Sequence, residues 1–117
     1  MKYMLMIYDP DDWWEASTPE QVAAAMEAHG AFAAYLQGRG AAFSGEGLQS
    51  SKAATTLRPS DNADGFVITD DPFVDLKETL GGFYIIEAAD LDDAIEVAKR
   101  CPAGPGIEIR PVVEFAG

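Results

Sequence analysis

The sequence predicts a single α+β domain, and three observations support this prediction. The chain has 117 residues, which is the size of one domain covering residues 1–117. Apolar residues make up 48% of it, as in folded globular proteins. Patterns typical of strands and helices follow one another as strand–helix–strand, hairpin, strand–helix–strand. This βαββαβ order with an inserted hairpin matches a ferredoxin-like fold.

The first predicted strand covers residues 2–8 and is closed by Asp9-Pro10. Both of its faces are apolar, because Tyr3, Leu5 and Ile7 alternate with Met4, Met6 and Tyr8. A strand that is apolar on both faces has to be covered on both faces.

A helix is predicted over residues 19–37. Thr18 can cap it, Pro19 suits the first helical position, and Gln21 stands where the partner in a capping box belongs. Glycines end it at Gly38. Its apolar stripe has 4-3-4-3 spacing and consists of Val22, Met26, His29, Ala33 and Leu36.

The rest of the chain continues the pattern. Residues 70–82 are expected to be mostly loop, with room for one helical turn at 74–79. The other predicted elements are a strand at 41–44 with an optional extension over 45–48, a hairpin of 55–58 and 65–69, a strand at 83–88, a helix at 91–101 and a strand at 107–115.

The strands at 2–8 and 83–88 are the first and third main strands, which lie in the centre of a ferredoxin-like sheet. Both are apolar on both faces. Two helices cover only one face of such a sheet, so the other face needs a partner. We expect a second copy of the chain in that place, and therefore a homodimer packed through its sheets.

Charge and cysteine content exclude several classes of protein. The formal net charge is −12, which is unsuited to gripping a nucleic acid or an anionic membrane surface. There is no apolar run long enough to span a membrane, and the N-terminal strand is too short for a signal peptide. A single cysteine fits the reducing cytoplasm. We expect no cofactor and no metal, since one His and one Cys cannot form a typical nitrogen–sulfur site; an all-carboxylate cation site stays open.

His29, the one histidine, allows two interpretations. It is either a core histidine satisfied by one hydrogen bond, or a general acid/base at the bottom of a cleft, for which its ordinary pKa is well suited. Asp70, in Asp70-Asp71-Pro72-Phe73, is either a base with a raised pKa or part of an acidic turn.

Three further features keep a structural interpretation beside a functional one. Gly45-Glu46-Gly47 allows the backbone to approach a ligand, or forms a bulge. Trp13-Trp14 can cover a pocket, join the dimer contact or pack onto its own domain. Cys101 is expected to be a buried small residue.

Several segments together resemble the YCII-related family, in the branch named for an Asp-Gly-Pro-Phe (DGPF) motif. The segments, in chain order, are Met4–Tyr8, Gly45–Gln49, Ala54–Arg58, Thr69–Phe73, Lys77-Glu78, Gly81–Tyr84, Cys101-Pro102 and Glu108–Pro111. The resemblance spans nearly the whole chain. It implies a ferredoxin-like domain that dimerises into an α/β barrel.

The resemblance implies little about activity. Relatives include a dehydrochlorinase, the fold is shared with muconolactone isomerase and cofactor-free monooxygenases, and some members of the branch are linked to sigma factors. YCII proteins carry a first-helix His, at which His29 falls, and an Asp after the second helix. That second position falls near Cys101-Pro102 here, so Asp70 is the available substitute, and Asp71 stands where the motif has Gly.

Two hypotheses follow. In the first, the chain is a small cofactor-independent lyase or isomerase that moves a proton on a cyclic or aromatic molecule. His29 and Asp70 are then catalytic, and Glu46, Arg110, Trp13 and Phe73 bind substrate. In the second, it is a non-catalytic module that binds a small molecule or regulates, in association with a sigma factor.

Overall fold

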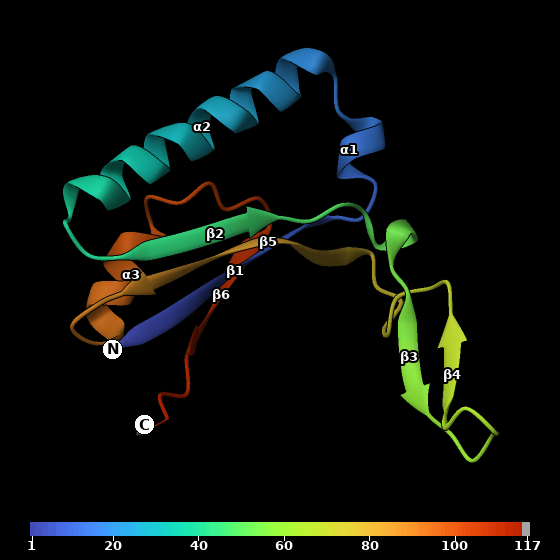
Figure 1. The fold of residues 1–117 in the computed structure, drawn as a ribbon. Coiled ribbons are helices and arrows are strands. Elements are labelled where there is room, and N and C mark those ends of the chain that lie inside the picture. Colours follow the sequence, from blue (N-terminus) through green and yellow to red (C-terminus); the bar gives the residue numbers. More distant parts are fainter. Residues whose placement is uncertain (116–117) are drawn as a thin grey trace.

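The computed structural model describes residues 1–115 and confirms the mixed α+β class (Figure 1). Its elements in chain order are β1 (Lys2–Pro10), α1 (Trp13–Ala16), α2 (Pro19–Gly38), β2 (Phe43–Gly47), the 3-10 turn η1 (Ser51–Ala53), β3 (Thr56–Pro59), β4 (Phe66–Thr69), β5 (Glu78–Glu87), α3 (Leu91–Ala98) and β6 (Gly106–Pro111).

Four of the strands form an antiparallel sheet in the order β2-β5-β1-β6. This order is compatible with a ferredoxin-like fold. It also confirms that the two strands with apolar residues on both faces, β1 and β5, are the central ones.

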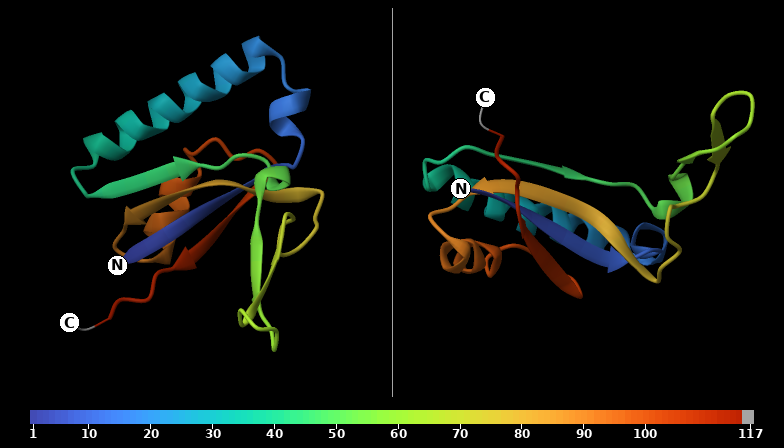
Figure 2. Two further views of the ribbon diagram at one scale, coloured as in Figure 1. Left: turned by 45° about the vertical axis from the view of Figure 1, so that its right-hand side comes forward. Right: turned by 90° about the horizontal axis from the view of Figure 1, so that it is seen from below.

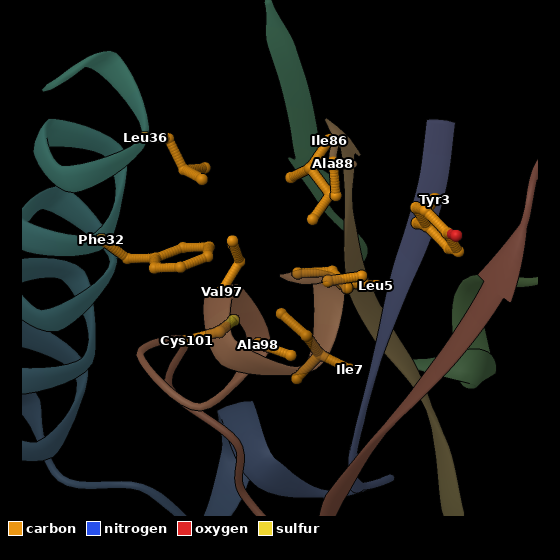
Figure 3. Packing of buried hydrophobic residues seen from close by; sticks show 11 residues of the cluster. Tyr3, Leu5, Ile7, Phe32, Leu36, Ile86, Ala88, Val97, Ala98 and Cys101 are labelled. Atoms are coloured by element: carbon orange, nitrogen blue, oxygen red, sulfur yellow. The ribbon is translucent and has the colours of Figure 1, made fainter. Parts of the chain in front are cut away.

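The hydrophobic core lies between one face of this sheet and the helices (Figure 3). Tyr3, Leu5 and Ile7 alternate along β1 and are all buried, as the strand period of two requires. Phe32 and Leu36 of α2 complete this core from one side, and α3 supplies Ala94, Val97 and Ala98. Burying each of the larger side chains stabilises the fold by about 1.5–3 kcal/mol.

Helix α2 starts as predicted, with a reciprocal capping box between Thr18 and Gln21. The buried residues of α2, Phe32 and Leu36, lie in its second half, whereas Met26 of the predicted stripe is 54% exposed. Figure 1 shows the reason: the first half of α2 diverges from the sheet. This divergence leaves space beneath His29.

Several predicted boundaries are wrong. Strand β5 begins at Glu78 instead of residue 83, so the helical turn considered at 74–79 is absent. The register shift between Ile7 and Tyr8 of β1 leaves Gly81 of β5 without a paired residue on β1, which is a β-bulge. This bulge lets β5 continue through a stretch that the sequence predicts to be a loop. Helix α3 ends at Ala98 and β6 at Pro111, earlier than predicted, and α1 replaces part of an expected loop.

The remaining strands, β3 and β4, pair with each other in a separate two-stranded sheet. We call residues 56–69 the arm. It projects away from the four-stranded sheet, on the side opposite α2 (Figures 1 and 2). Within residues 1–115, no helix is both long and apolar enough to cross a membrane.

Candidate functional site

A cavity of about 410 Å³ lies under the diverging half of α2. Helix α2 contributes Ala25, Met26 and His29 to its wall, and the sheet contributes the ends of β1, β2 and β5. The Trp13-Trp14 pair of α1 and the loop after α3 close it further. The volume suits a small cyclic molecule.

His29 faces this cavity and is half-buried. Its Nδ1 atom lies 2.8 Å from the hydroxyl oxygen of Tyr84 on β5, which is a hydrogen bond. The two rings are stacked at 5.9 Å between centroids. Within residues 1–115 no protein group is hydrogen-bonded to the other ring nitrogen, Nε2. His29 therefore has one nitrogen held by the protein and one available to a bound molecule.

Tyr84 is held in place by packing. The edge of the Phe32 ring contacts it at 4.9 Å between centroids. On its other side stands Gly45 of β2, directly opposite in the strand register. A Cβ atom on Gly45 would lie 2.6 Å from Cδ1 of Tyr84 and 2.9 Å from the backbone oxygen of Phe83. Gly45 is thus the residue that lets the Tyr84 ring lie flat across β2.

Asp9 is the carboxylate on the same side of the sheet. It follows Ile7 by two residues on β1 and lines the cavity together with His29. Two glycines make room for it: a Cβ atom on Gly81 would collide with the Asp9 carboxylate, and one on Gly104 would lie 2.7 Å from Oδ1. Gly104 also has φ +48°, a left-handed conformation that favours glycine.

Burial changes the acidity of all three groups. Desolvation lowers the pKa of His29 below 6.5, an effect that the nearby Asp9 carboxylate partly opposes. Burial raises the pKa of Asp9 from 3.8, and the charge of His29 acts in the opposite direction. Burial also raises the pKa of Tyr84. At neutral pH the site therefore holds a neutral imidazole bonded to a neutral phenol.

The rim of the cavity carries a further fixed negative charge. Oδ1 of Asp11 accepts hydrogen bonds from the backbone N–H of Ser51 at 3.1 Å and from the Thr79 hydroxyl at 3.0 Å. These bonds lower the pKa of Asp11, so its carboxylate is ionised at neutral pH. Beside it, the Trp13 and Trp14 rings meet edge to face at 4.8 Å.

The structure brings together some of the residues proposed from sequence and separates others. His29, Glu46 and Trp13 line the cavity. Asp70 follows β4 at the base of the arm, Phe73 lies there under the Arg58 guanidinium, and Arg110 is exposed on β6; none of the three lines the cavity. Within residues 1–115, no group of three or more His, Cys, Asp or Glu side chains is arranged to hold a metal ion.

The comparison with known families matches residues 1–116 to the model of the YCII-related domain. The chain belongs to the YCII-related family. A relative from Rhizobium meliloti (strain 1021), described as an uncharacterised protein, is 39% identical over 67 residues, which cover 54% of this chain. The chain spans about half the length, 52%, of that relative. Membership in the YCII-related family therefore identifies the type of domain and does not indicate a specific activity.

Asp9 and Tyr84 are the site residues of this YCII-related chain that sequence reasoning missed. The sequence pattern indicates only the end of a strand at Asp9, and at Tyr84 one apolar residue among several in the strand at 83–88. The available signal was position: both stand on the two central strands, in the alternation that faces the helices. A polar atom on that face has to be hydrogen-bonded or line a cavity.

Proposed function

We propose that the chain is a cofactor-independent enzyme that moves a proton on a neutral cyclic or aromatic molecule, with His29 as the acid–base group. The observation that carries the proposal is the position of His29 in the cavity, with Nδ1 bonded to Tyr84 and Nε2 left for a ligand. A positioned histidine contributes about 10²–10⁴-fold to a proton transfer.

The chemistry follows from the neutral state of the imidazole. When the Tyr84 hydroxyl accepts from Nδ1–H, the Nε2 lone pair can take a proton from an acidic C–H or O–H group of the bound molecule. Return of that proton to another atom gives an isomerisation, and departure of a leaving group instead gives an elimination. Asp9 stabilises the imidazolium between the two steps, because its charge favours the protonated ring.

We propose Asp9 in place of Asp70 as the carboxylate of the pair. Asp9 faces the cavity with His29, and each residue affects the pKa of the other. The segment Asp70-Asp71-Pro72-Phe73, which supports membership of the DGPF branch, has contacts of another kind. Asp71 accepts hydrogen bonds from the hydroxyls of Thr56 and Thr69, each at 2.6 Å, so this segment stabilises the arm.

The charge of the cavity wall supports a neutral substrate. Within the described residues, its lining includes the carboxylates of Asp9 and Asp11 and no lysine or arginine; Glu46 lines it from β2, where the register places its side chain with Phe83 on the other face of the sheet. A carboxylate or phosphate group would find no cationic partner and would face two carboxylates. The aromatic corner of Trp13 and Trp14 suits a flat ring instead. As a cellular location we propose the cytoplasm, where a free thiol such as Cys101 stays reduced.

The test is a screen of neutral phenols, enols and lactones. Binding is followed by the fluorescence of Trp13 and Trp14, the two tryptophans of the chain, and proton transfer by deuterium incorporation in D₂O. For a molecule that exchanges, we expect His29→Gln to slow exchange about 100-fold or more with binding retained. Tyr84→Phe should shift the pH profile of exchange.

The matched carboxylate variants separate the two candidates for the pair. Asp9→Asn should slow exchange, and Asp70→Asn should leave it unchanged. Exchange that is not slowed by His29→Gln would refute the proposal that the chain is an enzyme with His29 as its acid–base group. Ligand binding with no exchange in any compound would favour the regulatory module instead.

A further inference from the structure

We propose that Gly47 and Gly82 form a floor of the cavity on which an aromatic ring of the substrate lies flat, and that Gly47 makes the site selective for planar rings. The inference deepens the proposed function, and it rests on that function in taking the cavity as the place where the substrate binds. Three observations carry it: the rows of paired residues across the sheet, a ring that the protein itself holds over Gly45, and the open space at Gly47.

The floor is a part of the helix-facing side of the sheet from which side chains are missing. Residues that pair across neighbouring strands share a face, so a row of side chains can be followed from β1 through β5 to β2. Ile7 of β1 pairs with Gly82 of β5, and Gly82 pairs with Gly47 of β2. Two of the three positions in this row therefore carry no side chain, and all three residues line the cavity.

The neighbouring row shows what a glycine in this place holds. There Tyr84 pairs with Gly45, and its ring lies so close that a Cβ atom on Gly45 would be 2.6 Å from Cδ1 of the ring. An aromatic ring from the next strand commonly covers a glycine on an edge strand in this way. Gly47 lies on the same edge strand, two residues along, but the residue opposite it is Gly82. No ring therefore comes from the opposite position to cover Gly47.

The fold gives no steric reason for glycine at position 47. Within residues 1–115, a Cβ atom there would meet no atom within 4 Å beyond its chain neighbours, and the backbone is not in the left-handed region. The register of β2 with β5 is continuous from residue 43 to residue 47, so the bulge that the sequence also allowed is absent. Gly82 differs, because a Cβ atom on it would lie 3.0 Å from the backbone oxygen of Glu46. Glycine weakens a strand, so its presence at 47 fits a surface that a ligand approaches closely.

The opposite wall of the cavity suits the other face of the same ring. This wall comes from the diverging half of α2 and includes Met26 and His29. The thioether of methionine packs favourably against aromatic rings. Residues two apart on a strand are about 7 Å apart, so a ring on Gly47 would lie beside the Tyr84 ring, whose hydroxyl is bonded to His29. The substrate ring would thus lie next to the acid–base group.

A floor of bare backbone favours flat molecules. Two neighbouring strands lie about 4.8 Å apart, and where both residues are glycine no Cβ atom projects from their surface. A planar ring contacts such a surface over its whole face. The axial hydrogens of a saturated ring hold most of its atoms away, and dispersion attraction falls steeply with distance. The floor therefore narrows the substrate class to neutral molecules with an aromatic or fully conjugated ring.

Trp13 and Trp14 are the other aromatic surface of the cavity, and they make a different prediction. They lie on α1, where their rings meet edge to face. A ligand held by these two rings alone would affect the NMR signals of α1 and leave those of Gly47 and Gly82 unchanged. The position of the ligand ring can therefore be measured directly.

The experiment is an NMR titration of the isotopically labelled full chain with 2-naphthol, a flat neutral phenol, and with decahydro-2-naphthol, its saturated counterpart. Protons that lie over the face of an aromatic ring shift upfield. One Hα atom of each glycine stands where a side chain would begin. We expect 2-naphthol to shift these Hα signals at Gly47 and Gly82, and the saturated compound to bind about tenfold more weakly.

Gly47→Ala is the matched variant. Its methyl group would project from the floor under the ring, so we expect the Kd of 2-naphthol in calorimetry to rise about tenfold. The free energy of unfolding in urea should stay unchanged, because the methyl group meets no protein atom. The control is Gly106→Ala, at a strand glycine that has equal space within the described residues and does not line the cavity. It should leave both quantities unchanged.

The proposal is overturned if 2-naphthol shifts only signals of α1, if Gly47→Ala binds it as tightly as the wild type, or if the saturated compound binds equally well. A wild type that binds neither compound overturns it too. These results are distinct from a failure of the proposed enzyme, because the titration measures no proton transfer. Naphthol bound on Gly47 in His29→Gln supports the floor even where no compound exchanges a proton. Exchange of an aromatic compound at the wild-type rate and affinity in Gly47→Ala would keep the enzyme and refute the floor.

Discussion

The position of His29 depends on contacts made by residues that carry no chemistry of their own. Gly45 leaves space for the Tyr84 ring, and the Tyr84 hydroxyl orients the imidazole through Nδ1. On the other side of the cavity, Gly81 and Gly104 leave space for the Asp9 carboxylate. Tyr84 and Asp9 are therefore positioned by missing Cβ atoms on neighbouring strands and a loop, and His29 by its hydrogen bond to Tyr84.

The titration of His29 follows from this placement. Because burial lowers its pKa, we expect the imidazole to be mostly neutral at pH 6.5, where a free histidine would be half protonated. A base with a lowered pKa keeps its proton-accepting form in more acidic solution. Proton abstraction by His29 should therefore fall only below pH 6.5. Nitrogen NMR can measure the titration without assignment, since the chain has one histidine.

Asp9→Asn provides the internal control for this pKa. The Asp9 carboxylate favours the imidazolium, so its removal should lower the pKa of His29 further. An increase after Asp9→Asn, or a wild-type value above 6.5, would contradict the arrangement of charges described for the cavity.

At the scale of elements, periodicity and turn residues were sufficient to predict the order of the six strands and of helices α2 and α3, but not α1. The capping box at Thr18 and the alternation of Tyr3, Leu5 and Ile7 are local signals, and both predictions are confirmed. The divergence of α2 from the sheet has no local signal in the sequence, because the apolar stripe of a helix does not indicate how much of that stripe the sheet covers. The early start of β5 depends on a bulge at Gly81, which glycine-rich sequence also predicts as loop.

The site was predicted incompletely for the same reason. His29 could be proposed because one histidine on an apolar stripe stands out. Asp9 and Tyr84 join it through the pairing of β1 with β5, which sequence spacing does not reveal. Asp70 stands out as a motif residue, yet it follows β4, a strand of the arm, and does not line the cavity.

The contact of β2 with β5 makes a prediction at this scale. Gly45→Ala should destabilise the fold by about 1–3 kcal/mol, because the new methyl group overlaps the Tyr84 ring and the Phe83 backbone. Gly47→Ala, two residues along the same strand, meets no atom within 4 Å and should be close to neutral. Urea unfolding measures both variants. Equal stabilities would show that β2 shifts freely past Tyr84.

At the scale of the whole molecule, a thin plate with a projecting arm has to be stabilised by a small core. Its principal extents are 51 × 46 × 18 Å, so a single layer of helices covers the sheet. One cluster of buried side chains joins β1, α2, β5 and α3. We therefore expect the four-stranded sheet and its helices to unfold together, with no part of the core surviving alone.

Cys101 reports on this cooperativity. It is 5% exposed beside the end of α3, and burial raises the pKa of its thiol to about 12. Since the thiolate is the reactive form, iodoacetamide at pH 8 should label the native chain only through global opening. The dependence of the labelling rate on urea concentration should match that of the free energy of unfolding, because labelling requires global opening. Labelling of the native chain as fast as a free cysteine would show a local opening near Cys101. If a second copy stabilises the fold, labelling should also slow as protein concentration rises, because association favours the folded state by mass action.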